Sequence, residues 1–169
     1  MDDNTQPIAN RVTLRPVVAP DDEQFLQELY TNVRDDLVGI FDNEHLERQM
    51  LQTQYLGQKM TYESEFPNAD HDIVLLDGRP VGRLLVERRH DSVFGVDLAV
   101  LSEFRNLGIG TVIVDRLIEE GSQRGVPFII SVVKSNPAFR LYRRLGCNVD
   151  GESATHFFLS WGREESVSG

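Results

Sequence analysis

The chain has 169 residues, of which 40% are hydrophobic and 26% charged, and these values are typical of one globular domain with a sizeable core. Its net charge of −10 argues against binding to nucleic acid or to an anionic membrane, because both would repel it. Short apolar runs broken by charges exclude a membrane-spanning helix, the single Cys147 excludes an internal disulfide, and four scattered histidines lack the spacing of metal ligands.

The charge is unevenly distributed along the chain. Residues 1–77 hold 16 acidic and 5 basic side chains, a net charge of −11, whereas residues 78–169 hold 11 acidic and 12 basic ones, a net charge of +1. We expect the acidic half to be mainly a solvated surface, and the neutral half leaves room for a local anion site. The start of the chain is polar and acidic and is not typical of a secretory signal, so we expect a cytoplasmic protein. We expect one domain over 1–169, with 1–10 and 163–169 flexible.

The first predicted elements are a strand that starts at residue 11 and ends at Pro16, a helix at 20–33 and a longer helical stretch at 34–66. β-Branched residues alternate in the strand "RVTLRPVV", and Pro20 followed by two aspartates is a typical helix start. The apolar residues that share one helix face are Phe25, Leu26, Leu29 and Val33 in the first helix and Leu46, Met50, Leu51 and Tyr55 in the second.

From residue 71 onward the pattern changes to short strands, predicted at 71–76, 79–89 and 92–101. Asp77 and Gly78 separate the first two and suit the positive backbone angles of a tight hairpin. A helix at 110–124, a strand at 127–134, a helix at 136–146 and a strand at 155–161 follow. In the last of these helices Asn136 is a predicted cap and Gly146 a predicted stop. This order predicts an α/β domain with a mixed sheet.

Two glycines, Gly108 and Gly110, open the helix predicted at 110–124 although glycine costs a helix interior about 1 kcal/mol relative to alanine. Neither a P-loop nor a dinucleotide fingerprint fits, because Gly110 is followed by Thr111, Val112 and Ile113. Glycines at a helix start let backbone N–H groups converge on an anion, and Arg105 adds a cation beside them. A tight turn that binds nothing is the simpler interpretation of an isolated Gly-x-Gly.

The segment from residue 98 to 146 resembles the acetyl-CoA-binding core of the GNAT superfamily of N-acetyltransferases. "LAVLSEFRNLGIG" carries the family pattern Arg/Gln-x-x-Gly-x-Gly/Ala, and "NPAFRLYRRLG" carries Leu-Tyr-x-x-x-Gly. The order of elements is also similar to the family over residues 11–161. The resemblance implies an α/β fold of the α+β type, with a mixed, mostly antiparallel sheet flanked by helices on both faces. It also implies transfer of an acetyl group from acetyl-CoA to a primary amine by direct attack in a ternary complex.

The resemblance assigns roles to particular residues. The loop that starts at Arg105 would wrap the pyrophosphate of coenzyme A, and the preceding strand would pair with the pantetheine arm where it diverges from the strand at 127–134. The predicted coenzyme-binding residues are Leu98, Ala99, Val100, Arg105, Asn106, Leu107, Gly108, Ile109, Gly110, Thr111 and Asn136. Tyr142 would be the general acid that protonates the departing thiolate. Without the surrounding motif, a tyrosine packed in the core is the competing interpretation.

This sequence departs from the family pattern at three places. Asn136 stands one residue closer to the Leu-Tyr pair than is common, and Cys147 replaces a phenylalanine, where we expect a small buried side chain. The strand at 127–134 carries no carboxylate that would serve as general base. Asp97 is therefore the candidate base, acting directly or through water, and His71 is a weaker one.

The part of the chain that would bind the acceptor is residues 30–70, which lie outside the motifs of the resemblance. The sequence therefore leaves several acceptors possible: peptide amino termini, lysines, polyamines, aminoglycosides and small amino metabolites. The acidic first half favours a small-molecule or peptidyl amine that carries positive charge, because a negative field concentrates cations. A non-catalytic acetyl-CoA-binding sensor or assembly module is the alternative function, and a protein that docks a basic partner through its acidic half is a third. We expect a monomer or a homodimer, no metal, and no nucleic-acid or membrane partner.

Overall fold

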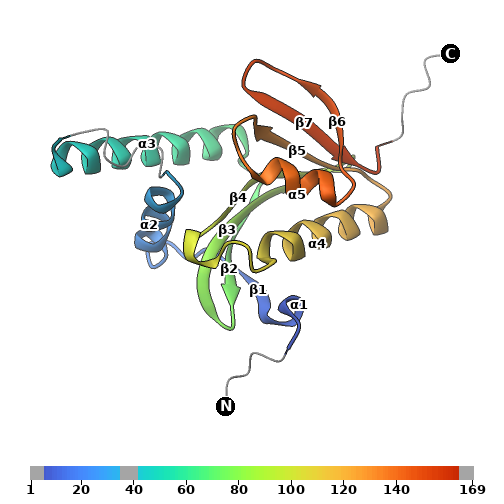
Figure 1. Ribbon diagram of the computed structural model, residues 1–169, viewed down its shortest axis with the longest axis horizontal. Helices are drawn as coiled ribbons and strands as arrows, with labels where there is room; N and C mark the ends of the chain where they lie inside the picture. Colours follow the sequence, from blue (N-terminus) through green and yellow to red (C-terminus); the bar gives the residue numbers. More distant parts are fainter. Residues whose placement is uncertain (1–5, 35–41, 164–169) are drawn as a thin grey trace.

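One sheet forms the centre of the fold (Figure 1). The computed structural model describes residues 6–34 and 42–163, and within these ranges seven strands pair in the order β1-β2-β3-β4-β5-β7-β6. Neighbouring strands run antiparallel except β4 and β5, which run parallel. The strands are β1 (Val12–Pro16), β2 (Asp70–Leu76), β3 (Arg79–Arg88), β4 (Val93–Val100), β5 (Phe128–Val133), β6 (Asn148–Glu152) and β7 (His156–Trp161). The predicted mixed, mostly antiparallel sheet is confirmed.

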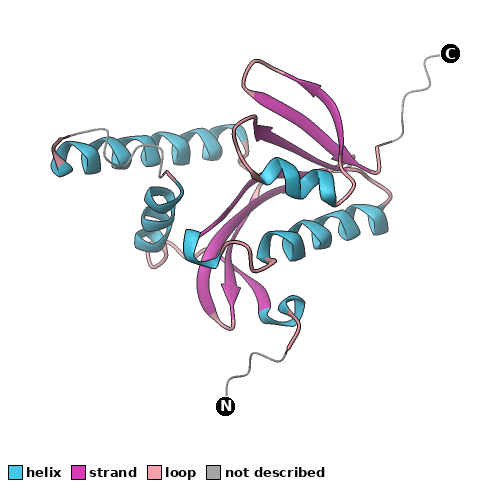
Figure 2. Ribbon diagram, in the orientation of Figure 1, coloured by secondary structure: helices cyan, strands magenta, loops and turns pink. Residues whose placement is uncertain are grey.

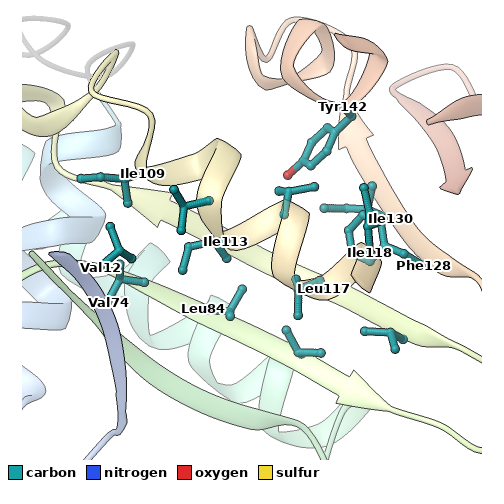
Figure 3. Close-up of a cluster of buried hydrophobic side chains, with 14 of the residues drawn as sticks. Val12, Val74, Leu84, Ile109, Ile113, Leu117, Ile118, Phe128, Ile130 and Tyr142 are labelled. Carbon is teal, nitrogen blue, oxygen red and sulfur yellow. The ribbon is translucent and has the colours of Figure 1, made fainter. Parts of the chain in front are cut away.

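Helices flank both faces of this sheet, as predicted (Figure 2). They are α1 (Ile8–Arg11), α2 (Glu23–Val33), α3 (Glu44–Glu65), α4 (Ile109–Arg124) and α5 (Ala138–Arg144), with a short 3-10 helix, η2 (Ser102–Phe104). Alternation along β2 explains the two layers: Val74 and Leu76 join the apolar cluster that contains α4, whereas Ile73 and Leu75 pack with α2 and α3. Figure 3 shows the first cluster, with the side chains of α4 lying between those of the strands and Tyr142.

Local sequence signals account for several boundaries. Asp77 and Gly78 have φ angles of 50° and 82°, which is the backbone that the predicted hairpin requires. The Asn136 side chain accepts a hydrogen bond from the Ala138 N–H at 2.9 Å, and Gly146 ends the same helix with a φ of 95°. These three predictions are confirmed.

Other elements differ from the prediction. Strand β6 (Asn148–Glu152) was not predicted, because its sequence "NVDGE" lacks apolar alternation and its pairing with β7 holds it in the sheet. Of the helical stretch predicted at 34–66, α3 covers Glu44–Glu65, and residues 35–41 lie outside the described part. The described end of the segment 1–10, which we expected to be flexible, contains most of the single turn α1. No helix within the described residues is long and apolar enough to cross a membrane.

Strand β4 separates from β5 halfway along its length. The two strands pair only from Val93 to Gly95, and Gly95 lies opposite Ile130 at the last paired position. The register between β3 and β4 shifts at the same level, because Val86 pairs with Gly95 whereas the preceding β3 residue pairs with Asp97. One extra β4 residue therefore forms a bulge, and beyond it the edge of β4 that faces β5 has no strand partner.

Candidate active site

The glycine turn leads directly into α4. Asn106 and Gly108 adopt positive φ angles of 62° and 91°, and the helix starts at Ile109. The Val112 N–H donates to the Gly108 carbonyl at 3.0 Å, and within the described residues no side chain caps the helix. The N–H groups of the first turn, 109–111, are therefore directed out of the helix end, where the helix dipole favours an anion.

Each glycine of this turn also has a structural reason that needs no ligand. Gly108 supplies the left-handed backbone of the turn, which a residue with a β-carbon rarely adopts. A β-carbon on Gly110 would lie 3.1 Å from the Leu141 side chain, so this glycine allows α4 and α5 to pack closely. The Gly-x-Gly motif alone is therefore not evidence of a bound anion, and the argument depends on what surrounds it.

Two exposed arginines flank the turn. Arg105 donates from Nε to the carbonyl of Val100 at 3.2 Å, and Arg144 of α5 donates to the Thr111 hydroxyl at 3.3 Å. Sequence reasoning missed Arg144, because only the packing of α5 against α4 brings it to the turn. Asn136 lies at the other end of α5, where its side-chain oxygen is occupied by the helix cap.

The end of β4 has one paired and one open edge. Leu98, Ala99 and Val100 pair with β3, whereas their other edge lies beyond the last β4–β5 pair. Gly82 of β3 is needed here, because a β-carbon on it would overlap the carbonyl oxygen of Ala99. Backbone groups on an open edge of this kind can pair with an extended ligand as another strand would.

Tyr142 projects from α5 into the apolar cluster and is only 3% exposed (Figure 3). Its hydroxyl makes no hydrogen bond to another described residue. Burial raises the pKa of Tyr142 above its usual value, and the negative charge of Asp97 raises it further. The hydroxyl therefore stays protonated at physiological pH and is available as a donor.

Asp97 forms a partly buried ion pair that the sequence analysis did not foresee. Arg83 of β3 donates to Asp97 Oδ2 from Nε at 3.0 Å and from Nη2 at 2.5 Å, and Nη2 also donates to Gln58 of α3 at 2.6 Å. The guanidinium also lies over the ring of Tyr62, 5.5 Å from its centre. A charged residue inside the apolar run "VGRLLV" was the available signal, because a buried arginine needs a partner.

A small cavity of about 80 Å³ lies between α2, α3 and the ends of β3 and β4. It is lined by Leu29, Tyr30, Val33, Arg34, Gln58, Arg83, Asp97 and Ala99. Ala99 also belongs to the open edge of β4, so the cavity adjoins the segment where the pantetheine arm is predicted. The acidic side chains of residues 1–77 that the structure describes do not line it.

His71 and Cys147 lie outside this cavity. Burial and the nearby Arg83 lower the pKa of His71 to about 4, and its buried Nε2 has no hydrogen-bond partner among the described residues. Cys147 is 1% exposed, and burial raises the pKa of its thiol to about 11, as fits an unreactive core residue. Across residues 6–34 and 42–163, no three His, Cys, Asp or Glu side chains are grouped so that they could hold a metal ion.

Comparisons with solved structures show the same fold. PaiA N-acetyltransferase from Thermoplasma acidophilum, in complex with coenzyme A, is 15% identical and has a TM-score of 0.63 over 88% of this chain and 97% of that one. A Salmonella typhimurium acetyl transferase that modifies the N-terminal serine of a ribosomal protein is 15% identical, with a TM-score of 0.62 over 94% and 98% of the two chains. Naa50 from Arabidopsis thaliana, in complex with the bisubstrate analogue CoA-Ac-MVNAL, is 15% identical, with a TM-score of 0.57 over 89% and 98%.

Sequence comparison identifies the family. A comparison with curated proteins finds no significant match. The family model of the acetyltransferase (GNAT) family, however, matches residues 28–147, which include the second half of α2, all of α3, the open edge of β4, the glycine turn and Tyr142. The chain therefore belongs to the acetyltransferase (GNAT) family.

Proposed function

We propose that this protein is an N-acetyltransferase that moves an acetyl group from acetyl-CoA to a primary amine by direct attack in a ternary complex. The observation that carries the proposal is the second half of β4. Asp97 and Ala99 line the cavity, Ala99 and Val100 belong to the open edge, and the Val100 carbonyl is bonded to Arg105 at the glycine turn. Sites for the acceptor, the pantetheine arm and the pyrophosphate thus follow one another along one strand.

Acetyl-CoA is the co-substrate in this scheme. The pyrophosphate accepts hydrogen bonds from the open N–H groups of the first turn of α4, with Arg105 and Arg144 beside it. The pantetheine arm pairs with Leu98, Ala99 and Val100 and directs the thioester toward the bulge. The coenzyme in the PaiA structure and the analogue in the Naa50 structure support this assignment.

The chemistry requires two proton movements. The amine nitrogen attacks the acetyl carbonyl carbon, the carbon–sulfur bond breaks, the nitrogen loses a proton and the thiolate gains one. Tyr142 is the proposed donor to the thiolate, because its hydroxyl is protonated and has no other hydrogen bond among the described residues. Its raised pKa reduces the driving force for full transfer, so close contact with the sulfur is essential. Asp97 is the proposed acceptor of the amine proton, directly or through water.

A small-molecule or peptidyl amine that carries positive charge is the proposed acceptor. The net charge of −11 in residues 1–77 attracts such an amine over a distance. Some of those acidic side chains are already neutralised by neighbouring arginines, since Asp22 pairs with Arg15 and Asp77 with Arg11. Asp35 and Asp36, two acidic residues of the segment 30–70 in which we expect the acceptor to bind, lie outside the described residues.

The test is thiol release from acetyl-CoA in the presence of an amine panel, with the acetylated product identified by mass spectrometry. Thiol release that depends on the amine is the expected result, and the matched control omits the amine. Coenzyme binding in calorimetry without amine-dependent release would favour the alternative, a non-catalytic sensor or assembly module. The absence of both coenzyme binding and thiol release would overturn the proposal.

A further inference from the structure

We propose that Asn32 is a positioning residue that couples the coenzyme side of the site to the acceptor side, so that coenzyme A bound at the glycine turn orders the helix that lines the cavity. The inference rests on the proposed acetyl transfer and deepens it, because it concerns how the two substrate sites depend on each other. The coupling is carried by a pair of hydrogen bonds between α2 and η2.

The first step is the geometry of this pair. The Ser102 N–H donates to Asn32 Oδ1 at 2.8 Å, and Asn32 Nδ2 donates to the Ser102 hydroxyl at 3.2 Å. Figure 1 shows η2, the short yellow helix between β4 and α4, beside α2. Because a hydrogen bond prefers a particular direction, two of them between the same residues fix the orientation of α2 relative to η2 as well as its distance.

The second step is the connection of η2 to the coenzyme side. Ser102 follows the open edge of β4, and the preceding Leu101 N–H donates to the Val81 carbonyl of β3 at 2.8 Å. The Arg105 N–H donates to the Ser102 carbonyl at 3.3 Å, and Arg105 Nε donates to the Val100 carbonyl at 3.2 Å. Arg105 begins the turn that is proposed to bind the pyrophosphate. A ligand that fixes Arg105 therefore restricts Ser102 through a direct backbone contact.

The third step is the connection of Asn32 to the acceptor side. Leu29, Tyr30 and Val33 lie within one helical turn of Asn32 and line the cavity. The side chains of Leu29 and Tyr30 are 1% and 7% exposed, so they are packed in the interior and move with the helix. Asn32 itself is directed to η2 and does not line the cavity. A change in the last turn of α2 therefore changes the cavity wall.

The fourth step is the energetic consequence. Helix ends open more easily than helix interiors, and α2 ends at Val33. Coenzyme A that restricts η2 therefore favours the folded last turn of α2 through the two hydrogen bonds. By linkage, an acceptor that restricts this turn strengthens coenzyme binding by the same factor. If Asn32 only stabilised η2 by accepting from its first N–H, α2 would not respond to the coenzyme.

Hydrogen exchange of the full chain, followed by mass spectrometry with and without saturating coenzyme A, measures the response. Coenzyme A carries no acetyl group, so the measurement needs neither an acceptor nor turnover. In the wild type we expect coenzyme A to slow exchange of the backbone N–H groups of residues 29–34 by roughly fivefold or more, as is typical of coupling between two sites. Calorimetry on the same sample measures coenzyme binding itself.

Variants assign the response to Asn32. Asn32→Ala removes both hydrogen bonds and should abolish the slowing in residues 29–34, while coenzyme A still binds in calorimetry. Asn32→Asp places one oxygen near the Ser102 N–H and the other near its hydroxyl, so it should keep the slowing. Gln24→Ala is the matched control, because Gln24 is an exposed side-chain amide of the same helix that donates only within α2, to Glu28 at 3.1 Å. It should respond to coenzyme A as the wild type does.

The outcomes separate this proposal from acetyl transfer. If coenzyme A binds to the wild type without slowing exchange in residues 29–34, the coupling is overturned and acetyl transfer is left intact. Slowing that persists in Asn32→Ala, or that is lost in Asn32→Asp, overturns the role of the two hydrogen bonds. If coenzyme A does not bind at all, the proposed function and the coupling are overturned together.

Discussion

Arg83 and Asp97 form an ion pair across β3 and β4 in which two nitrogens of the arginine donate to a single carboxylate oxygen. The side chains are 9% and 24% exposed, so each charge depends on the other for compensation. The register shift beside Asp97 places this carboxylate in the cavity lining together with Ala99 of the open β4 edge. One pair thus connects the stability of the sheet with the chemistry of the site.

Asp97→Asn should reduce both activity and stability. The amide cannot take a proton from the acceptor amine, so kcat should fall by about 100-fold, and the uncompensated guanidinium should cost about 2–3 kcal/mol of unfolding free energy. Thiol-release kinetics and urea unfolding measure the two effects. The control is Asp77→Asn, which breaks the exposed pair with Arg11 at a positive φ that asparagine tolerates, and which should change little. Wild-type kcat in a folded Asp97→Asn variant would exclude Asp97 as the base.

Tyr142→Phe should lower kcat by about 100-fold and leave the Kd for acetyl-CoA unchanged. The substitution removes the hydroxyl that is proposed to protonate the thiolate and keeps the ring that packs in the cluster. Single-turnover kinetics and calorimetry give the two quantities, and an unchanged unfolding midpoint shows that packing is preserved. An unaltered kcat across pH would mean that water or another group supplies the proton.

Arg105→Ala and Arg144→Ala should each weaken acetyl-CoA binding by roughly tenfold, with less effect at high salt, because each removes a cation beside the first turn of α4. Calorimetry at two salt concentrations measures this. Substitution of the arginines tests coenzyme binding more directly than substitution of the glycines. Valine at Gly108 would strain the turn, and valine at Gly110 would contact Leu141, whether or not a ligand binds. Arg163→Ala, at an exposed pair with Asp150, is the control and should keep the wild-type affinity.

His71 should make the protein less stable as the pH falls from about 6.5 to 4. Burial and Arg83 hold the pKa of His71 at about 4 in the folded chain, below its usual value of 6.5, so the unfolded chain binds the extra proton. The neutral His71 contributes roughly 2–3 kcal/mol to the free energy of unfolding. This contribution is fully present above pH 6.5 and is lost as the pH falls toward 4.

His71→Phe, which cannot titrate, should flatten the pH dependence of the unfolding free energy within this window. Asp22 provides an internal reference. Hydrogen bonds from Arg15 and the Val18 N–H hold its pKa at about 2, so its contribution is lost only as the pH falls below about 4. Unfolding by urea at several pH values measures both. The same slope between pH 6.5 and 4 in the wild type and in His71→Phe would contradict the assignment.

Local chemistry in the sequence was enough for much of the fold. Asp77-Gly78 predicts the hairpin and Asn136 with Gly146 predicts the limits of α5, because positive φ angles and helix caps depend on a few neighbouring residues. Alternating apolar residues predicted the strands that are buried on a face. The motifs around Gly108 and Tyr142 also pointed to the family to which the chain belongs.

The arrangement of the acceptor side required the folded structure. Pairing of Arg83 with Asp97 depends on the register between β3 and β4 and on the bulge, and strand register is set by contacts between residues distant in sequence. The place of Arg144 depends in the same way on the packing of α5 against α4. Strand β6 is exposed along most of its length, so no apolar periodicity marked it. Single-sequence patterns record which side chains prefer burial or a turn, whereas the cavity beside Ala99 exists only because two helices and two strands meet there.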